Sequence, residues 1–347
     1  MKNDTAFKNP LTFQIDPDLL TPATEEEKAQ QVTMRESVSF MRDAMNRLRK
    51  NKIAMVCLSV ILLIALIAFL VPGFYPYSYT GQDVEAKYMS PFQYSAKEQA
   101  RMAEGESIFP HIFGTDNLGR DYAIRVIYGT RISLLVGIVA ALIVVIIGII
   151  YGSISGYFGG KVDLVMMRIV DIIYALPDVL IVILLSVALK DIVSQSKNAL
   201  IIRLGAGMVS IFIVFGLLYW VGMARQVRGQ ILSIKEQEYV LASRAIGASP
   251  ARIIRTHMIP NCVSVIIITA AMQIPSAIFT ESFLSFLGLG VSIPMPSLGS
   301  LAADARAGLM SYPYLLVFPA LSIFLIVLSF NLLGNGLRDA FDPKLRT

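Results

Sequence analysis

EYVLASRAIGASPARIIRTHMIPN, residues Glu238 to Asn261, is a polar and basic segment between two long apolar runs. Its residue order predicts two short helices hinged at Gly247, because glycine readily adopts the left-handed conformation that ends a helix. Ser249 and Pro250 favour a second helix, with the serine as its cap and the proline as its first residue. We predict that this helix ends at Ile259, because Pro260 lacks the amide hydrogen needed to continue it.

The apolar runs on either side of this hairpin indicate an integral membrane protein. Apolar residues make up 55% of the 347 residues and charged residues only 16%, unlike the composition of soluble domains. Crossing the hydrocarbon layer of a bilayer takes about 20 residues. The runs of suitable length are residues 53–71, 132–154, 169–189, 204–224, 263–287 and 314–333. We therefore predict an all-α fold with six transmembrane helices.

The distribution of lysine and arginine predicts the orientation of these helices, because basic loops are retained in the cytosol. Residues 35–52, 157–168, 225–257 and 338–347 carry 17 basic residues, whereas residues 73–131, 190–203 and 290–312 carry 10 over a longer stretch. We expect the first group, the hairpin and both termini in the cytosol. The net charge of +5 follows from this topology and gives no reason to expect nucleic-acid binding.

This orientation divides the chain into five parts. Residues 1–52 form a cytosolic tail without an apolar leader, followed by a basic helix that lies on membrane lipid. Residues 53–72 are the first transmembrane helix, and residues 73–131 are an extracytoplasmic loop. Residues 132–337 hold five transmembrane helices and the hairpin at 238–261, and residues 338–347 are a cytosolic tail.

Motifs for chemistry are missing from the sequence. The string GYFGGKVD places Val162 where a nucleotide-binding P-loop needs serine or threonine to reach magnesium. Cys57 and Cys262 are isolated, which argues against a disulfide framework or a Cys/His metal site. We expect a non-catalytic chain that binds no cofactor and no metal.

Acidic residues inside the predicted spans are candidates for transport of ions or protons. Asp171 and Asp178 lie in the third span and Glu281 in the fifth. We expect Asp171 to pair with Arg168, three residues before it, and Glu281 to be satisfied within a helix interface beside Thr280 and Ser282. Pro177 and Pro275 are expected to kink their helices.

The hairpin resembles the EAA loop of ABC-importer permeases. Leu241, Ala242 and Ser243 stand at the E-A-A positions, and Ala242, Gly247 and Pro260 match the pattern outright. Glu238 is the carboxylate available near the position where the pattern has one.

Three further strings resemble the OppC/DppC type of permease from peptide ABC importers. They are FGTDNLGRDYAIRVIYGTRISL at 113–134, ESFLSFLGLGVSIPMPSLGSL at 281–301 and NLLGNGLRDAFDPKLR at 331–346. The first string reads physically as a polar turn that leads into the second span. Its motif residues are Gly114, Thr115, Asp116, Gly119, Arg120 and Asp121.

The resemblance implies a type I importer permease in a bacterial cell membrane. It implies a heterodimer with a B-type permease, two cytosolic ATPases that bind ATP and magnesium, and an external protein that delivers peptides. The ATPase-coupling residues would be Glu238, Ala242, Arg244, Gly247, Ala248 and Pro260, with the small residues in close contact and Arg244 paired to the ATPase. Residues 73–131 and 290–312 would contact the delivering protein.

Other functions stay open at this point. A dipeptide or nickel importer would share these motifs. A proton-coupled secondary carrier is a different class of protein. Three features argue against it: the six spans, the lack of a buried basic residue and the lack of an internal repeat. A membrane scaffold would transport nothing.

Overall fold

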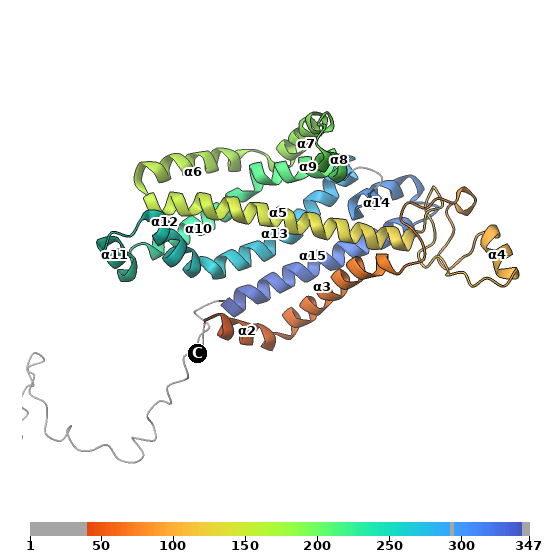
Figure 1. The fold of residues 1–347 in the computed structure, drawn as a ribbon, viewed down its shortest axis with the longest axis horizontal. Coiled ribbons are helices and arrows are strands. Elements are labelled where there is room, and N and C mark those ends of the chain that lie inside the picture. Colours follow the sequence, from red (N-terminus) through yellow and green to blue (C-terminus); the bar gives the residue numbers. More distant parts are fainter. Residues whose placement is uncertain (1–39, 292–294, 342–347) are drawn as a thin grey trace, which may run out of the picture. The chain divides into compact units, whose positions relative to one another are not determined.

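The computed structural model describes residues 40–291 and 295–341 (Figure 1). The chain divides into residues 1–43 and residues 44–347, and the description below concerns the second unit apart from the start of α2. All regular elements in the described ranges are helical. The helices that build the bundle are α3 (Lys52–Leu70), α5 (Tyr122–Phe158), α6 (Gly160–Ala175), α7 (Asp178–Ser194), α9 (Ala206–Val214), α10 (Trp220–Ile234), α13 (Val263–Phe286) and α15 (Tyr314–Phe341).

Shorter helices lie between or beside these. They are α2 (Phe40–Lys50), α4 (Ala96–Ala103), α8 (Ala199–Leu204), α11 (Glu238–Ala245), α12 (Pro250–Ile253) and α14 (Leu298–Ala305). Figure 1 shows α11 and α12 at one end of the bundle and α4 at the other. We call these the hairpin end and the loop end.

The predicted spans correspond to five long helical stretches and one broken pair. The stretches Lys52–Gly73, Tyr122–Phe158, Ala206–Ile234, Pro250–Phe286 and Tyr314–Phe341 are long and apolar enough to cross a membrane. The sixth is α6 with α7, whose axes differ by 89°. The prediction of six spans agrees with this count when the pair is taken as one span.

The predicted third span is nevertheless wrong as a single helix over residues 169–189. Pro177 cannot donate a backbone hydrogen bond, and it forces the residue before it out of the helical conformation. Leu176 accordingly has an extended backbone with φ −74° and ψ 142°. Pro275, by contrast, lies inside α13 without ending it.

Helix α5 begins at Tyr122, ten residues before the predicted second span at 132–154 and within the stretch predicted as an extracytoplasmic loop. The carboxylate of Asp121 accepts a hydrogen bond from the amide of Ile124 and caps the helix at Tyr122. The polar residues Arg125 and Thr130 lie in this first part of α5, and both are buried. Their polarity hid the helix start from a reading based on apolar runs.

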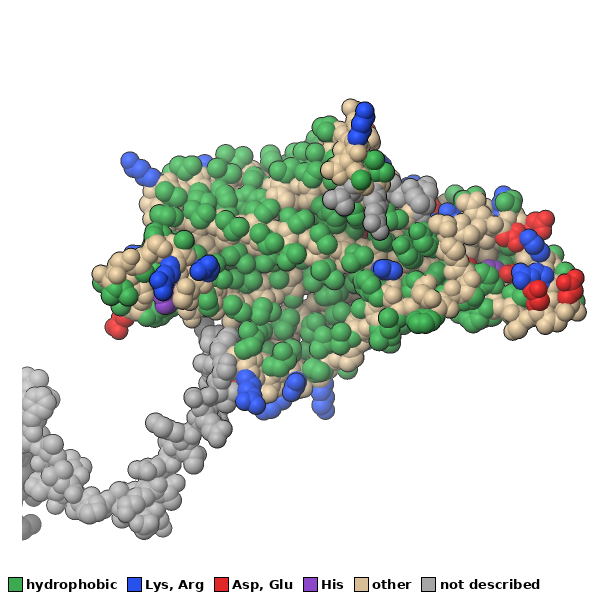
Figure 2. Space-filling model, in the orientation of Figure 1, with side chains coloured by type: hydrophobic (Ala, Val, Ile, Leu, Met, Phe, Trp, Pro, Cys, Tyr) green, Lys and Arg blue, Asp and Glu red, His purple; other side chains and the backbone are tan. Residues whose placement is uncertain are grey.

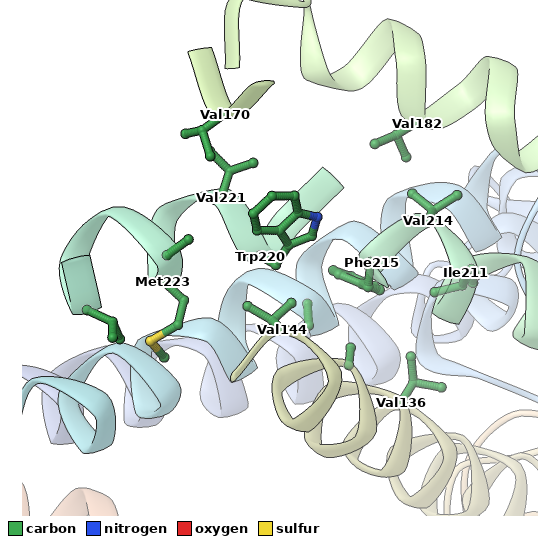
Figure 3. Close-up of a cluster of buried hydrophobic side chains, with 14 of the residues drawn as sticks. Val136, Val144, Val170, Val182, Ile211, Val214, Phe215, Trp220, Val221 and Met223 are labelled. Carbon is green, nitrogen blue, oxygen red and sulfur yellow. The ribbon is translucent and has the colours of Figure 1, made fainter. Parts of the chain in front are cut away.

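The largest core cluster surrounds α5 and α10. Gly148, Gly152 and Gly156 recur at a spacing of four, and a Cβ atom at Gly148 would lie 2.4 Å from Met223 Cγ. Small residues at this spacing let two helix backbones approach closely. Figure 3 shows Val144 of α5 in this cluster and Val170 of α6 beside Val221 of α10. The core therefore joins α5, α6 and α10 into one packed group.

Candidate functional site

The hinge of the hairpin has the conformation that the sequence predicts. Gly247 has a φ of 82°, its amide donates to the carbonyl of Arg244 (2.9 Å), and the amide of Ala248 donates to the carbonyl of Ser243 (3.0 Å). These two hydrogen bonds form a Schellman motif, which closes a helix and turns the chain.

The second arm of the hairpin differs from the prediction. Pro250 is the first residue of α12 as expected, but the side chain of Ser249 makes no capping hydrogen bond. The helix does not end at Ile259, because helical structure continues from Pro250 to Phe286. The amide of Ile259 donates five residues back to Ile254, so a π-helical turn precedes Pro260 and a 3-10 turn contains it. These irregular turns accommodate the missing amide hydrogen of the proline, and the hairpin is continuous with α13.

Both arms of the hairpin are anchored in the main core. Val240 of α11 and Ile253 and Met258 of the second arm are fully buried in it. The guanidinium of Arg244 lies 5.0 Å from the centre of the Tyr157 ring, next to the turn between α5 and α6. The hairpin is therefore fixed to α5, α10 and α13 and moves only with them.

The outer surface of the hairpin is exposed. The predicted coupling residues Glu238, Ala242, Arg244, Gly247 and Pro260 are exposed and Ala248 is half-buried. Three apolar side chains that are not among the predicted coupling residues are exposed beside them: Tyr239 (43%), Leu241 (45%) and Ile246 (85%). We call these three side chains and Ala242 the hairpin patch. The sequence contained one signal for this exposed patch: Ile246 lies directly before Gly247, the glycine that ends the helix.

Two ion pairs join α6 to α10. Asp171 accepts from Arg225 at 2.7 Å, so the expected pairing with Arg168 is wrong. Asp163 accepts both the Nε and Nη2 groups of Arg228, each at 2.5 Å. The partners lie more than fifty residues apart in the chain, which is why sequence spacing did not reveal them.

Glu281 of α13 is fully buried among hydroxyl groups. Its carboxylate accepts from Ser133 of α5 at 2.9 Å and from Ser285 at 2.7 Å, with a longer contact to Ser282 at 3.4 Å. Thr280 instead forms a hydrogen bond with the hydroxyl of Tyr219 at 3.3 Å. The expectation that Glu281 is satisfied within a helix interface is confirmed, although Ser133 and Ser285 provide most of the contact.

The residues of the family motif lie in one tight turn at the loop end. Gly119 has a φ of 69°, and a Cβ atom there would lie 1.6 Å from the carbonyl oxygen of Asp83. The hydroxyl of Thr115 donates to the carbonyl of Ala86, and the amide of Met89 donates to Thr115 Oγ1 at 2.9 Å. The turn is thus packed against the loop that follows α3.

Asp116 is the charged centre of this turn. Its carboxylate accepts from the Nε group of Arg120 at 2.7 Å, from Arg125, and from the amide of Leu118 at 2.8 Å. All three charged residues are at most 9% exposed. The expectation that the chain has no buried basic residue is wrong, because the motif supplies a carboxylate to two arginines. The cluster lies where α5 begins, outside the central part of any span.

His111 bridges two further carboxylates near the same turn. Its Nδ1 atom lies 2.7 Å from Asp121 and its Nε2 atom 3.2 Å from Glu98, and all three residues are buried. Burial alone would lower the pKa of His111, but the hydrogen bond and charge of Asp121 and the charge of Glu98 outweigh burial and raise it. His111 therefore joins α4 to the cap of α5.

The candidate residues do not form one site. The hairpin residues gather at one end and the motif residues at the other, whereas Asp171 and Glu281 have no partner in common. Within residues 40–291 and 295–341, we find no group of three or more His, Cys, Asp or Glu side chains able to hold a metal ion.

Comparison with known proteins gives two family matches. Residues 145–347 match the family described as the binding-protein-dependent transport system inner membrane component. Residues 39–91 match the N-terminal transmembrane domain of oligopeptide transport permease C.

Individual relatives cover most of the chain. The oligopeptide transport system permease protein OppC of Bacillus subtilis (strain 168) is 43% identical over 90% of this chain and 92% of its own length. The dipeptide transport system permease protein DppC of the same strain is 44% identical over 90% of this chain and 88% of its own length. OppC of Escherichia coli (strain K12) is 40% identical over 90% of this chain and 93% of its own length.

Proposed function

The chain belongs to the family of binding-protein-dependent transport system inner membrane components, and we propose that it is a permease subunit of an ATP-driven importer of oligopeptides. The observation that carries this proposal is the hairpin patch, an exposed apolar surface on a hairpin that is anchored in the core. A chain without a P-loop needs a partner to hydrolyse ATP, and such a patch is suited to bind one.

The hairpin suits the transfer of movement from a partner ATPase. Its second arm continues into α13, and its first arm follows α10 after a short turn. A displacement of the hairpin therefore moves two membrane helices together, since packed helices shift as rigid elements. We place the hairpin end, and with it both termini, in the cytosol, because that end carries the basic segments noted above.

A second permease is proposed to cover α6 and α7. Apolar side chains on these two helices are exposed by 52–65%: Leu164, Val165, Ile172, Val179, Leu180 and Leu184. Figure 2 shows apolar side chains over the visible face of the bundle, with most acidic and basic side chains toward its ends. A heterodimer with a B-type permease would bury part of this surface, and lipid would cover the rest.

The first experiment is purification of the tagged chain in mild detergent, followed by mass spectrometry and an ATPase assay. We expect a second permease and two P-loop ATPases to co-purify, with ATP hydrolysis that rises when a peptide-loaded binding protein is added. Recovery of the chain alone, active in proton-driven uptake, would contradict the importer and support a secondary carrier, with Asp171 and Glu281 as the next residues to test. Absence of any substrate-dependent activity would support a scaffold.

The coupling role of the hairpin is tested by Gly247→Trp, with Gly247→Ala as control. Both changes place a side chain at a φ of 82°, so both bear the same backbone strain. A Cβ atom at this position meets nothing within 4 Å in the chain itself, so the two variants differ mainly in the bulk that they present to a docked partner. We expect Gly247→Trp to abolish uptake while the binding protein still captures peptide, and Gly247→Ala to retain uptake. Normal uptake by Gly247→Trp would refute the coupling role.

We also propose that the binding protein docks at the loop end. Deletion of residues 85–105 from this loop would not be a clean test of docking. It would remove contacts that hold the fold, because Tyr88 stacks on Tyr312 and the carbonyl of Met89 accepts a hydrogen bond from the hydroxyl of Tyr314. The better variant combines Phe92→Ser with Met310→Ser, whose parent side chains are 66% and 97% exposed. Stimulation of ATP hydrolysis by the binding protein should fall while basal hydrolysis persists. Unchanged stimulation would place the docking surface elsewhere.

The substrate is proposed to be an oligopeptide, with a dipeptide as the alternative. Relatives named for either substrate are similar to this chain to nearly the same degree. Uptake by the purified complex of di-, tri- and pentapeptides, with nickel as a further substrate, separates these cases.

A further inference from the structure

The break between α6 and α7 borders a cavity of about 470 Å³. The wall opposite the break comes from the π-helical segment Phe215–Tyr219 and the start of α10. Six of the lining residues matter here: Ile173, Tyr174, Asp178, Leu218, Tyr219 and Gly222. The volume falls in the range of small-molecule binding sites, and π-helical segments occur frequently at functional sites.

One side chain of this cavity is an exposed carboxylate. Asp178 accepts a hydrogen bond from the amide of its neighbour Val179 at 2.8 Å, and the described residues supply it with no ion pair. The arginine close to the cavity is already engaged, because Arg225 is paired with Asp171 at 2.7 Å and stacks 4.3 Å from the centre of the Tyr174 ring. A carboxylate within a membrane span is costly unless it faces a cation or water.

Two helix ends meet at the break, the last carbonyl groups of α6 and the first amide groups of α7, which begins at Asp178. The last carbonyl groups of α6 point toward the break, and Pro177 has no amide hydrogen to donate to them. Only Leu176 turns back, with its amide 3.3 Å from the carbonyl of Ile173. The carboxyl end of a helix favours a nearby cation, whereas Ile173, Leu218 and the rings of Tyr174 and Tyr219 offer apolar walls.

We propose that this cavity binds the protonated terminal amine of a peptide in transit, with Asp178 as its counter-charge. A divalent metal ion needs several ligands, whereas a peptide amine needs one carboxylate and a few carbonyl groups. The apolar walls then contact the first side chain of the peptide without selecting it strongly, which suits a transport path that must release its cargo. This inference rests on the proposed importer function.

The test uses the whole importer complex with Gly222→Cys in this chain. A Cβ atom at Gly222 meets nothing within 4 Å, and the native Cys57 and Cys262 are buried. Alkylation of the new cysteine by N-ethylmaleimide, measured on this chain by mass spectrometry, reports whether the cavity is occupied. Trialanine and Nα-acetyl-trialanine are the two probes, since acetylation removes the positive charge of the terminal amine and adds only a small neutral group.

We expect trialanine to protect the cysteine, and acetyl-trialanine to need a concentration about tenfold or more higher, the loss expected for one charge-assisted hydrogen bond. Asp178→Asn should remove this difference, while its amide oxygen can still accept the hydrogen bond from the amide of Val179. Asp191→Asn, near the other end of the same helix, is the matched control and should keep the difference.

Three results would overturn the inference. They are equal protection by both probes in the parent complex, no protection by either, and a preference for the free amine that survives in Asp178→Asn. If neither probe protects the cysteine in the parent complex and Asp178→Asn also assembles more weakly with the second permease, Asp178 instead forms an ion pair with a basic residue of that permease. Peptide uptake by the parent complex is measured in parallel. Its absence would refute the importer, whereas intact uptake without protection refutes the amine site alone.

Discussion

The two ends of the helix bundle treat their polar and apolar residues in opposite ways. At the loop end, Asp116, Arg120 and Arg125 are charged and yet buried in contact with one another. At the hairpin end, Ile246 is apolar and 85% exposed. The charged residues of the loop end stabilise the fold of this chain through their contacts with one another. The exposed isoleucine adds no buried contact that would stabilise the fold. The difference predicts that changes at the loop end cost stability and that changes on the hairpin patch cost transport.

The largest effect on stability is expected from Asp116→Ala. This change leaves two buried arginines without their shared carboxylate, which costs about 3–5 kcal/mol in the free energy of unfolding. Thermal unfolding of the detergent-purified protein measures it. The control is Glu106→Ala, whose partner Arg101 is 54% exposed at its side chain and whose loss costs about 0–1 kcal/mol. Equal losses for both variants would show that burial of the Asp116 cluster does not stabilise the loop end.

A smaller effect is expected from Glu281→Gln between the two ends. The hydroxyl of Ser133 accepts from the amide of Leu298 at 3.3 Å and that of Ser285 from the amide of Val291 at 3.2 Å. Each hydroxyl therefore gives its proton to Glu281. A glutamine presents one NH2 group in place of a carboxylate oxygen, so one hydroxyl loses the acceptor of its proton, at a cost of about 1–3 kcal/mol.

Thermal unfolding measures this cost, and Glu236→Gln on the exposed turn before α11 is the control. Uptake measured with and without a proton gradient distinguishes a structural from a coupling carboxylate. Unchanged stability combined with loss of gradient-driven uptake would contradict the structural role of Glu281.

The pH dependence of stability tests the contribution of His111 at the loop end, and we expect a smaller effect than those above. The folded state raises the pKa of His111 because Asp121 and Glu98 outweigh the effect of burial. A raised pKa means that protonated His111 stabilises the fold fully below its ordinary value of about 6.5. That stabilisation is lost as the pH rises through the folded pKa. Unfolding temperatures between pH 5 and 9, compared with those of His111→Gln, should show a fall with pH that the variant lacks. Parallel curves would exclude the bridge as a source of pH dependence.

The smallest effect on stability, with a large effect on transport, is expected from Ile246→Ser. An exposed side chain changes the free energy of unfolding by less than about 0.5 kcal/mol. Loss of its burial against a partner should reduce uptake about tenfold. Ile53→Ser, which alters another exposed isoleucine (64%) in α3, is the control and should keep uptake. Loss of stability without loss of uptake in Ile246→Ser would reverse the comparison between the two ends.

Local features of the fold were predictable from the sequence. Gly247 ends α11 because the conformation it needs depends on that residue and its neighbours alone. The number of spans followed from the length of the apolar runs, since each run must satisfy its own backbone in lipid. The hinge of the hairpin was predictable for the same reason, because its hydrogen bonds join residues close together in the chain.

Features that depend on distant partners were not predictable. Asp171 pairs with Arg225 instead of Arg168, and Asp163 pairs with Arg228, which lies 65 residues further along the chain. Pro260 and Pro177 show the same limit. Each proline removes one backbone hydrogen bond. The helix continues through irregular turns at Pro260, whereas at Pro177 the axes of the two flanking helices differ by 89°.

The sequence by itself determined a membrane protein of six spans with a hinged hairpin, because span length and a left-handed glycine are local requirements. Only the tertiary structure decided which charges are paired and which apolar side chains stay exposed, because both depend on what the packed helices bring alongside. The exposed Ile246 and Asp178, which has no ion pair with any described residue, belong to this second class, and they are the residues through which we expect this chain to bind its ATPase and its peptide.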